Sequence, residues 1–327
     1  MADILTTIVP LFTIVFLGFV AGRRMSVFDE TGAQKLTALV FYFAIPALAF
    51  RTVSGALADG GTPELRLLFA YYGAEVCVFA FAALTGWLVW RRSMAGCVVM
   101  GLSSTFSNGF YMALPITYAL FGEAGVAQLL LILVLDSMLL LPFAMVLLDI
   151  AKARDIESGR RGGHSLGIGK VLKTAAGNIV KNPALIGVMG GLVFGSSGLA
   201  LPEIADKTLV LISQAALPCA LFAIGCDLAH RGMSREPGPI GTVVLTKLVM
   251  FPFLVFTFAT LLELSVLPLA VATVVASMPV GATAFIAATQ YNAAVGIATT
   301  AIVVSTSIAV ATISAVLYQL NSLGLTP

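Results

Sequence analysis

The stretch SSTFSNGFYMALP at residues 103–115 places polar residues, a glycine and a proline inside a long apolar run. A second stretch, SMPVGAT at 277–283, interrupts a later apolar run in the same way. Proline removes a backbone donor and displaces the carbonyl four residues earlier, so each stretch predicts a broken helix. Pro279, for example, would free the carbonyl of Val275. Because lipid cannot satisfy free backbone groups, such breaks in a membrane must line protein or a wet cavity.

The composition places these breaks in a membrane protein. The chain has 327 residues, of which 59% are hydrophobic and 10% charged, with a mean hydropathy of +1.02. An average soluble domain has roughly 25% charged residues, so these values exclude a soluble enzyme, a nucleic-acid-binding protein and a disordered chain. A spanning helix needs about 20 apolar residues. The apolar runs predict an all-α polytopic protein with ten spans, at residues 3–22, 34–52, 65–90, 95–121, 124–150, 179–200, 204–229, 239–262, 266–290 and 293–320.

The distribution of basic residues predicts the orientation. If the N-terminus lies outside, 14 of the 18 Lys and Arg residues fall in inner loops and three in outer loops. The remaining one, Lys247, lies within a span. The positive-inside rule then places both termini outside and the central loop, 152–178, in the cytoplasm.

The two halves of the chain carry the same pattern of proline and glycine. The first and sixth spans share one spacing of a proline and two glycines: Pro10, Gly18 and Gly22 in the first, and Pro183, Gly191 and Gly195 in the sixth. Pro46 and Pro218 occupy equivalent places in the second and seventh spans, where we expect them to act as structural kinks. The pattern predicts two five-helix repeats, and because five is odd the second copy must be inverted, as in many transporters.

The repeats predict how the chain divides and how the breaks face each other. The first repeat covers 1–151 and the second 179–327, joined by the loop at 152–178. Near the ends of the fourth and ninth spans, EAGV at 123–126 matches NAAV at 292–295. Extending that register back to the breaks places Asn108 opposite Ser277.

Two broken helices from inverted halves would cross near the middle of the membrane. Their half-helix N-termini would present positive dipole ends and free N–H groups, which suit an anion such as a carboxylate. The alternative is that both breaks are kinks filled by neighbouring Ser and Thr side chains. The candidate substrate-binding residues are Ser107, Asn108, Gly109, Tyr111, Pro115, Pro279, Gly281 and Thr283.

Three charged residues fall well inside predicted spans: Glu75, Asp136 and Lys247. An ionised group at mid-bilayer costs about 2.5–3.5 kcal/mol, so such residues usually face a cavity or a partner. Glu75 and Lys247 occupy equivalent places in the third and eighth spans and could pair across the two halves, although Lys247 could instead snorkel to the cytoplasmic side. Asp136 has no basic neighbour in sequence and is the best candidate for coupling to a proton or cation.

No motif indicates catalysis, a cofactor or a metal. The four cysteines form no CxxC pair, and both histidines, His164 and His230, lie in predicted loops. No GxxxxGK[ST] loop is present, which excludes drive by ATP. The GxxxG spacings, such as Gly18 with Gly22, favour close helix packing within the chain, with a homodimer seam as the alternative.

Four stretches carry a resemblance to a known family: LTALVFYFAIPALAF (36–50), KNPALIGVMGGLVFG (181–195), AALPCALFAIGCDLA (215–229) and SMPVGATAFIAATQYN (277–292). Over nearly its whole length the chain resembles the auxin efflux carrier family, which includes plant PIN-type carriers and bacterial malonate or malate carriers. The spacing from Asn108 to Pro115 is similar to the family's crossover motif. Two positions depart from it, Ala113 where glycine is common and Thr283 where bacterial members often have asparagine, and both lie near the expected ligand.

The resemblance implies the fold of bile-acid-symporter-like and sodium/proton-antiporter-like proteins. Spans 1, 2, 6 and 7 would form a scaffold, and spans 3–5 and 8–10 a transport domain that moves as an elevator. It implies a secondary transporter of organic anions that forms dimers through the scaffold, and the short central loop suggests a bacterial inner membrane.

The coupling ion is left open. It could be a proton through Asp136 or Glu75, no ion at all, or sodium near Ser103, Ser104 and Thr105. A cation–proton antiporter is disfavoured because the predicted breaks hold no carboxylate, and a membrane receptor without flux is the remaining alternative.

Overall fold

The computed structural model describes residues 2–58, 64–157, 183–197, 199, 201–230 and 234–325. Within these ranges the regular elements are all helical, and six helices are long and apolar enough to cross a membrane. The all-helical membrane class predicted from composition is therefore confirmed. Most of the predicted cytoplasmic loop at 152–178, from residue 158 onward, lies outside the described ranges.

The N-terminal half begins with α1 (Ala2–Arg24) and contains its longest unbroken helix in α4 (Leu65–Leu88). Within α6, Gly122 has a φ of +63° and breaks the helix at the boundary between the fourth and fifth predicted spans. The other elements of this half are η1 (Ser26–Phe28), α2 (Glu30–Leu39), η2 (Val40–Ala44), α3 (Ile45–Ala58), α5 (Met94–Thr105), η3 (Gly109–Ala113), α6 (Leu114–Leu135), η4 (Asp136–Leu140) and α7 (Leu141–Glu157).

The C-terminal half ends with the longest helix, α16 (Val295–Ser322). The elements before it are α9 (Pro183–Ser196), α10 (Glu203–Gln214), α11 (Ala216–His230), α12 (Pro237–Leu245), η5 (Thr246–Met250), α13 (Phe251–Leu261), α14 (Val266–Ala276) and α15 (Ala282–Gln290). Helices α10 and α11 meet at Ala215, three residues before Pro218, so the seventh predicted span bends there.

Four of these segments, η2, η3, η4 and η5, are π-helical, and each ends two residues before a proline. In η2, for example, the amide of Ile45 donates to the carbonyl of Val40, five residues earlier. A proline clashes with the carbonyl four residues before it, and the wider turn relieves that clash. The four prolines are Pro46, Pro115, Pro142 and Pro252. The widened turns and the effects of Pro142 and Pro252 were not predicted from the sequence.

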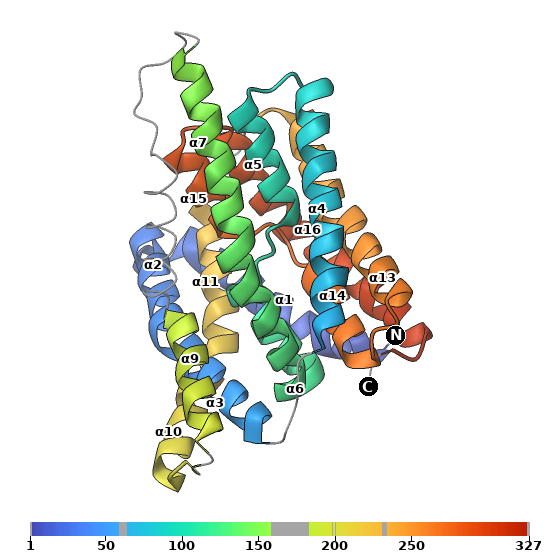
Figure 1. The fold of residues 1–327 in the computed structure, drawn as a ribbon. Helices are drawn as coiled ribbons and strands as arrows, with labels where there is room; N and C mark the ends of the chain where they lie inside the picture. Colours follow the sequence, from blue (N-terminus) through green and yellow to red (C-terminus); the bar gives the residue numbers. More distant parts are fainter. Residues whose placement is uncertain are drawn as a thin grey trace.

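Helices from the two halves pack closely through glycines, α1 against α11 and α3 against α9 (Figure 1). A Cβ added to Gly18 would lie 2.1 Å from the carbonyl oxygen of Phe222, and one added to Gly191 would lie 2.7 Å from that of Phe50. The two glycines hold the same place in the repeated proline and glycine pattern, and each phenylalanine follows the kink proline of its span by four positions. The two helix pairs therefore make the same contact with the roles of the halves exchanged.

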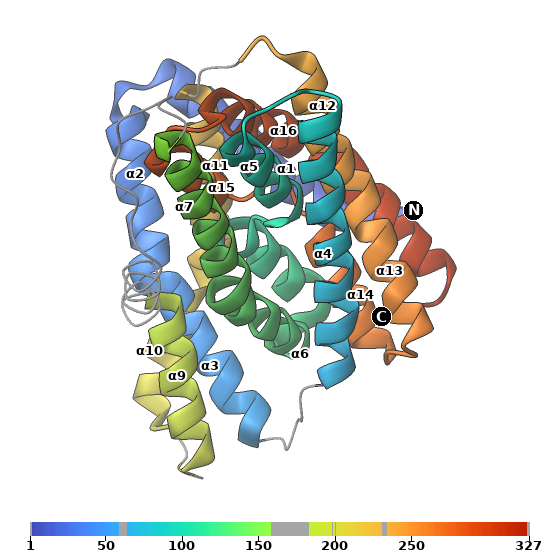
Figure 2. The same cartoon turned by 45° about the horizontal axis from the view of Figure 1, so that its top comes forward.

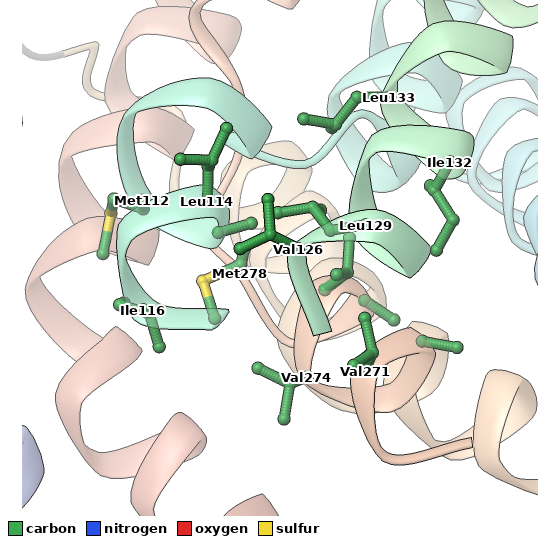
Figure 3. Packing of buried hydrophobic residues seen from close by; sticks show 14 of the residues in the cluster. Met112, Leu114, Ile116, Val126, Leu129, Ile132, Leu133, Val271, Val274 and Met278 are labelled. Carbon is green, nitrogen blue, oxygen red and sulfur yellow. The ribbon is translucent and has the colours of Figure 1, made fainter. Parts of the chain in front are cut away.

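The core lies where the broken helices pack together. Figure 3 shows apolar side chains of η3 and α6, among them Met112 and Leu129, facing Val271 and Val274 of α14. Helices α4 and α13 also contribute buried residues to this core, and they lie side by side at one flank of the molecule (Figure 2). Their outward side chains include Phe69 and Phe253, which are exposed and apolar, as expected of a surface that faces lipid.

Candidate functional site: the crossing of two broken helices

The two breaks predicted from sequence meet in the interior. The amide of Asn108 donates to the carbonyl of Pro279 at 2.9 Å, and the amide of Gly281 donates to the carbonyl of Phe106 at 2.9 Å. This exchange forms an isolated antiparallel bridge between the extended segments 106–108 and 279–281. Backbone groups that helix breakage leaves free are thereby satisfied away from lipid.

The register of this bridge differs from the one predicted. Ser107 lies opposite Val280, and their separation along the chain equals that of the counterpart glycines Gly18 and Gly191. The predicted register, with Asn108 opposite Ser277, is wrong. It came from a match in the loops beyond the breaks, whereas backbone hydrogen bonding fixes the register at the crossing itself.

Lys247 lies at this crossing and is fully buried. Its ammonium donates to the Ser107 hydroxyl at 2.9 Å and to the Ala276 carbonyl at 2.8 Å, and it lies 4.6 Å from the centroid of the Phe251 ring. The alternative that Lys247 snorkels to the membrane surface is therefore wrong. Its oxygen ligands are neutral, and none of the described ion pairs joins it to Glu75, so the two predicted partners are near each other without a direct contact.

Two buried carboxyl groups lie near the ammonium. Glu75 is 2% exposed and Asp136 is 1% exposed, and the charges of both act on Lys247. The hydroxyl of Tyr72 donates to Oδ1 of Asp136 at 3.0 Å. Oε1 of Glu75 and Oδ2 of Asp136 have no hydrogen-bond partner in the described part of the chain. The cluster thus holds two carboxyl groups and one amine, and all three groups are buried.

A cavity of about 650 Å³ lies beside the crossing, between α2, α11, α15 and α16. Asn108 and Tyr111 line it from the first break, and Ala282 lines it from the second. The Asn108 side chain makes no hydrogen bond among the described residues, and neither does the buried hydroxyl of Thr306, which borders the cavity from α16. The remaining lining combines polar Gln34, Thr37, Thr299 and His230 with apolar Ala33, Ala223, Ile224, Leu228, Phe285, Ile286 and Ile302.

The profile of the membrane transport protein family matches residues 3–317. The chain belongs to this family. Among its relatives, a candidate malonate transporter of Rhizobium meliloti is 28% identical over 98% of this chain and 97% of its own length. Auxin efflux carrier component 8 of Arabidopsis thaliana is 26% identical over 87% of this chain and 88% of its own. The transporter YfdV of Escherichia coli is 24% identical over 75% and 74%. The predicted membership of the auxin efflux carrier family is confirmed.

The other predicted site residues of this transporter lie around the crossing without lining the cavity. Pro279 and Gly281 form the second extended segment, Gly109 begins η3, and Pro115 is buried in the first turn of α6. Thr283 is half-buried on α15 beside the lining residue Ala282 but does not itself line the cavity.

The three hydroxyl residues considered for sodium have different surroundings. Thr105 donates to the carbonyl of Gly101 in its own helix, and Ser104 accepts from the hydroxyl of Thr246 at 2.8 Å. Only the hydroxyl of Ser103 lacks a partner among the described residues.

Sequence reasoning missed the contribution of α2, α11 and α16 to the cavity. Thr299 and Thr306 lie in an apolar helix with many hydroxyl residues. Most of these hydroxyls donate hydrogen bonds to backbone carbonyls of the same helix. Nothing in the local sequence distinguishes Thr306 from them. The sequence held a clearer signal for Lys247. It lies five residues before Pro252, and this proline indicates an irregular helical turn at the lysine.

Proposed function

We propose that this family member is a secondary carrier of small organic anions, such as malonate, malate or auxin-like acids, in a bacterial inner membrane. The observation that carries the proposal is the side-chain carboxamide of Asn108, which has no hydrogen-bond partner among the described residues and lines a cavity at the crossing of two half-helices. The names of the relatives agree with a substrate of this class.

An anion in this cavity would meet favourable electrostatics. The first amides of α15, beginning at Ala282, have no carbonyl partner within their own helix. The segment that begins at Gly109 presents a second helix N-terminus to the same place, and each such terminus carries a positive partial charge. The side-chain carboxamide of Asn108 and the hydroxyl of Thr306 could donate to a carboxylate. Phe285 and Ile302 would contact the hydrocarbon part of the ligand.

We further propose that the helices form ten spans in two inverted repeats. The reciprocal contacts of Gly18 and Gly191 support this arrangement, as does the crossing, where Ser107 and Val280 face each other in the register that the two glycines share. The scaffold would contain α1–α3 and α9–α11, and the transport domain the remaining helices. With the N-terminus outside, Gln34 and His230 lie at the inner ends of their spans, so the cavity would open toward the cytoplasm.

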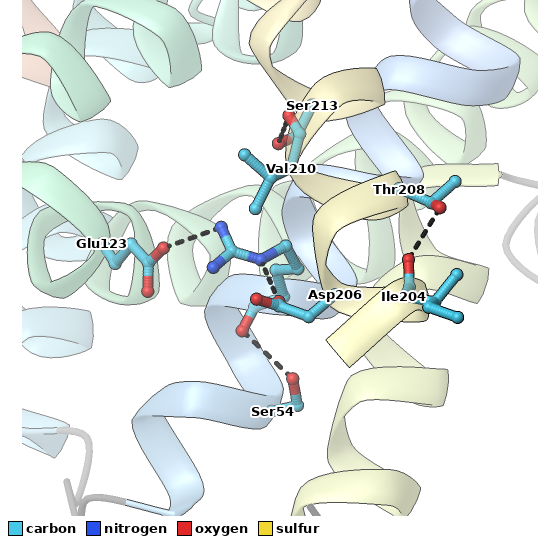
Figure 4. Close-up of polar contacts among 8 residues, drawn as sticks. Ser54, Glu123, Ile204, Asp206, Thr208, Val210 and Ser213 are labelled. Atoms are coloured by element: carbon cyan, nitrogen blue, oxygen red, sulfur yellow. Dashed lines mark hydrogen bonds and ion pairs between the residues drawn. The ribbon is translucent and has the colours of Figure 1, made fainter. Parts of the chain in front are cut away.

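An ion-pair cluster at the opposite end of the molecule would then hold the outer side closed. Arg51 of α3 donates to Asp206 of α10 at 2.8 Å and to Glu123, beside the Gly122 break, at 3.1 Å (Figure 4). Arg51 and Asp206 belong to the proposed scaffold and Glu123 to the proposed transport domain. An elevator movement would have to break the pair between Arg51 and Glu123.

Replacing Glu123 by glutamine should therefore raise the outward-open population about 1.4- to five-fold, because a partly exposed ion pair contributes about 0.2–1 kcal/mol. The measurement is the distance distribution between spin labels at Leu199 and Glu263, by pulsed electron paramagnetic resonance in a cysteine-free background. Glu203→Gln, which removes an ion pair within α10, is the matched control and should leave the distribution unchanged. Equal distributions in wild type and Glu123→Gln would contradict the proposed gate.

The function itself is tested by transient currents on a solid-supported membrane. Purified protein in liposomes receives concentration jumps of malonate, malate, succinate and indole acetate. We expect currents with at least one acid and a loss of at least ten-fold in Asn108→Ala, because a buried hydrogen bond to a charged group contributes about 1.5–3 kcal/mol.

Thr283→Ala serves as the matched control, since Thr283 lies beside the cavity without lining it. We expect this variant to keep at least half of the current. Absence of current and of radiolabelled exchange for all four acids in folded protein would overturn the proposed substrate class. Equal losses in the two variants would overturn the assignment of the site to the cavity.

A further inference from the structure

The ammonium of Lys247 lies at the C-terminal end of a half-helix. Helix α14 ends at Ala276, and the amides of Ser277 and Met278 donate to the other carbonyls of its last turn. Among the described residues, no amide donates to the carbonyl of Ala276 itself, as is usual for the last carbonyl of a helix. Lys247 donates to the carbonyl of Ala276, and the hydroxyl of Ser107 donates to the carbonyl of Val275 at 2.8 Å. Such an end carries a negative partial charge, and in broken transporter helices it is a place where coupling cations bind.

We infer that Lys247 is a built-in cation, which occupies the place that a monovalent metal ion would take between the two halves. Its ligands come from both sides of the crossing, Ser107 from the first break and Ala276 from the second. The ammonium is wholly buried at 2.8–2.9 Å from these oxygens, and the Phe251 ring closes another side. A tethered ammonium is always present at its site, whereas a free ion must be bound from solution. The protein therefore needs no sodium to hold the crossing together.

Removal of this amine should leave a cation-binding site at the crossing. Shortening the side chain to alanine removes the positive charge and leaves an open space. The oxygens of Ser107 and Ala276 then border that space, and the carboxyl groups of Glu75 and Asp136 act on it. A site with this lining and no cation of its own should bind one from solution, such as Na⁺, K⁺ or propylammonium.

Thermal unfolding of the purified protein in detergent tests this inference without any substrate, so its result does not depend on the proposed function. Wild type and Lys247→Ala are compared in choline, sodium, potassium and propylammonium chloride at equal ionic strength. Wild type should melt at the same temperature in choline and sodium, within about 1 °C. Lys247→Ala should melt lower in choline and rise by about 5 °C in at least one other cation at a hundred-fold excess over its Kd.

Two further variants separate the loss of charge from the loss of packing. Lys247→Met is also neutral but fills the space, so it should show no cation-dependent rise. Lys207→Ala removes an exposed lysine and should behave as wild type in all four salts. A sodium-dependent rise in wild type would overturn the inference. So would a Lys247→Ala protein that no cation stabilises, or one that fails to fold in all four salts while Lys247→Met folds.

If neither Lys247 variant can be purified, the Ser107→Ala variant tests the inference instead. It keeps the ammonium but removes one of its two oxygen ligands, so it should melt below wild type in choline and gain nothing from sodium. Stabilisation of Ser107→Ala by sodium would show that a free ion binds at the crossing, which contradicts the inference.

Discussion

Alanine in place of Gly281 is expected to lower the melting temperature by more than about 5 °C and to abolish transport. A Cβ at this position would lie 2.7 Å from the carbonyl oxygen of Ser107 and 2.9 Å from the ring of Phe106. The Ser107 carbonyl accepts the amide of Gly109 at 2.7 Å, so it cannot retreat without weakening that bond. The new methyl group would therefore separate the two extended segments and leave buried backbone groups unpaired, at a cost of about 1–3 kcal/mol each.

The conformation of Gly281 makes this a purely steric test. Its φ of −78° and ψ of 148° are open to every residue, so alanine brings no backbone strain of its own. Gly241 in α12 provides the matched control, because a Cβ there meets nothing within 4 Å. Alanine in a helix interior is favoured over glycine by about 1 kcal/mol, so Gly241→Ala should melt at or above the wild-type temperature. Similar melting temperatures for Gly281→Ala and Gly241→Ala would show that the close approach at the crossing does not support the fold.

The second large effect concerns the buried carboxyl groups. The cluster contains Glu75, Asp136 and Lys247, with the hydroxyls of Tyr71, Tyr72 and Ser107 as its polar neighbours. One ammonium can balance one carboxylate, and a second bare carboxylate in a buried site would be very costly. We therefore expect the cluster to hold one exchangeable proton, which would be released or taken up as the transport domain moves.

The double variant Glu75→Gln, Asp136→Asn should then lose the dependence of flux on a pH gradient. In wild type, one coupled proton would change the accumulation ratio of the substrate up to about ten-fold per pH unit, because one unit corresponds to about 1.36 kcal/mol. In the double variant the ratio should stay constant. The measurement is the accumulation of radiolabelled substrate by substrate-free liposomes with imposed pH differences of zero, one and two units.

Tyr72→Phe is the matched control for the carboxyl variants. It removes the hydrogen bond to Asp136 but keeps both carboxyl groups, so the pH dependence of flux should persist. A double variant whose accumulation ratio still follows the pH gradient would exclude both residues as the coupling site. A wild-type protein whose flux ignores the gradient would indicate uncoupled transport, driven by the substrate gradient and the membrane potential.

The sequence alone was sufficient for the class, the family and the places where helices break. Apolar content and charge depend only on composition, and they determine whether a chain enters the membrane. Proline acts on the backbone within a few residues, so the breaks near Asn108 and Pro279 could be located without any tertiary information. Glycines with a repeated spacing also indicated which helices pack closely, and Gly18 and Gly191 do so.

Tertiary structure alone decided how these local features meet. The register of Ser107 opposite Val280 and the position of the Lys247 ammonium join residues that are far apart along the chain, which no local pattern can specify. The cavity is likewise lined by residues of α2, α11, α15 and α16, so the position of Thr306 beside it depends on packing between elements. The physical reason is that sequence periodicity determines only which face of a helix is apolar. Close packing between the two halves determines which buried polar groups from distant parts of the chain contact each other.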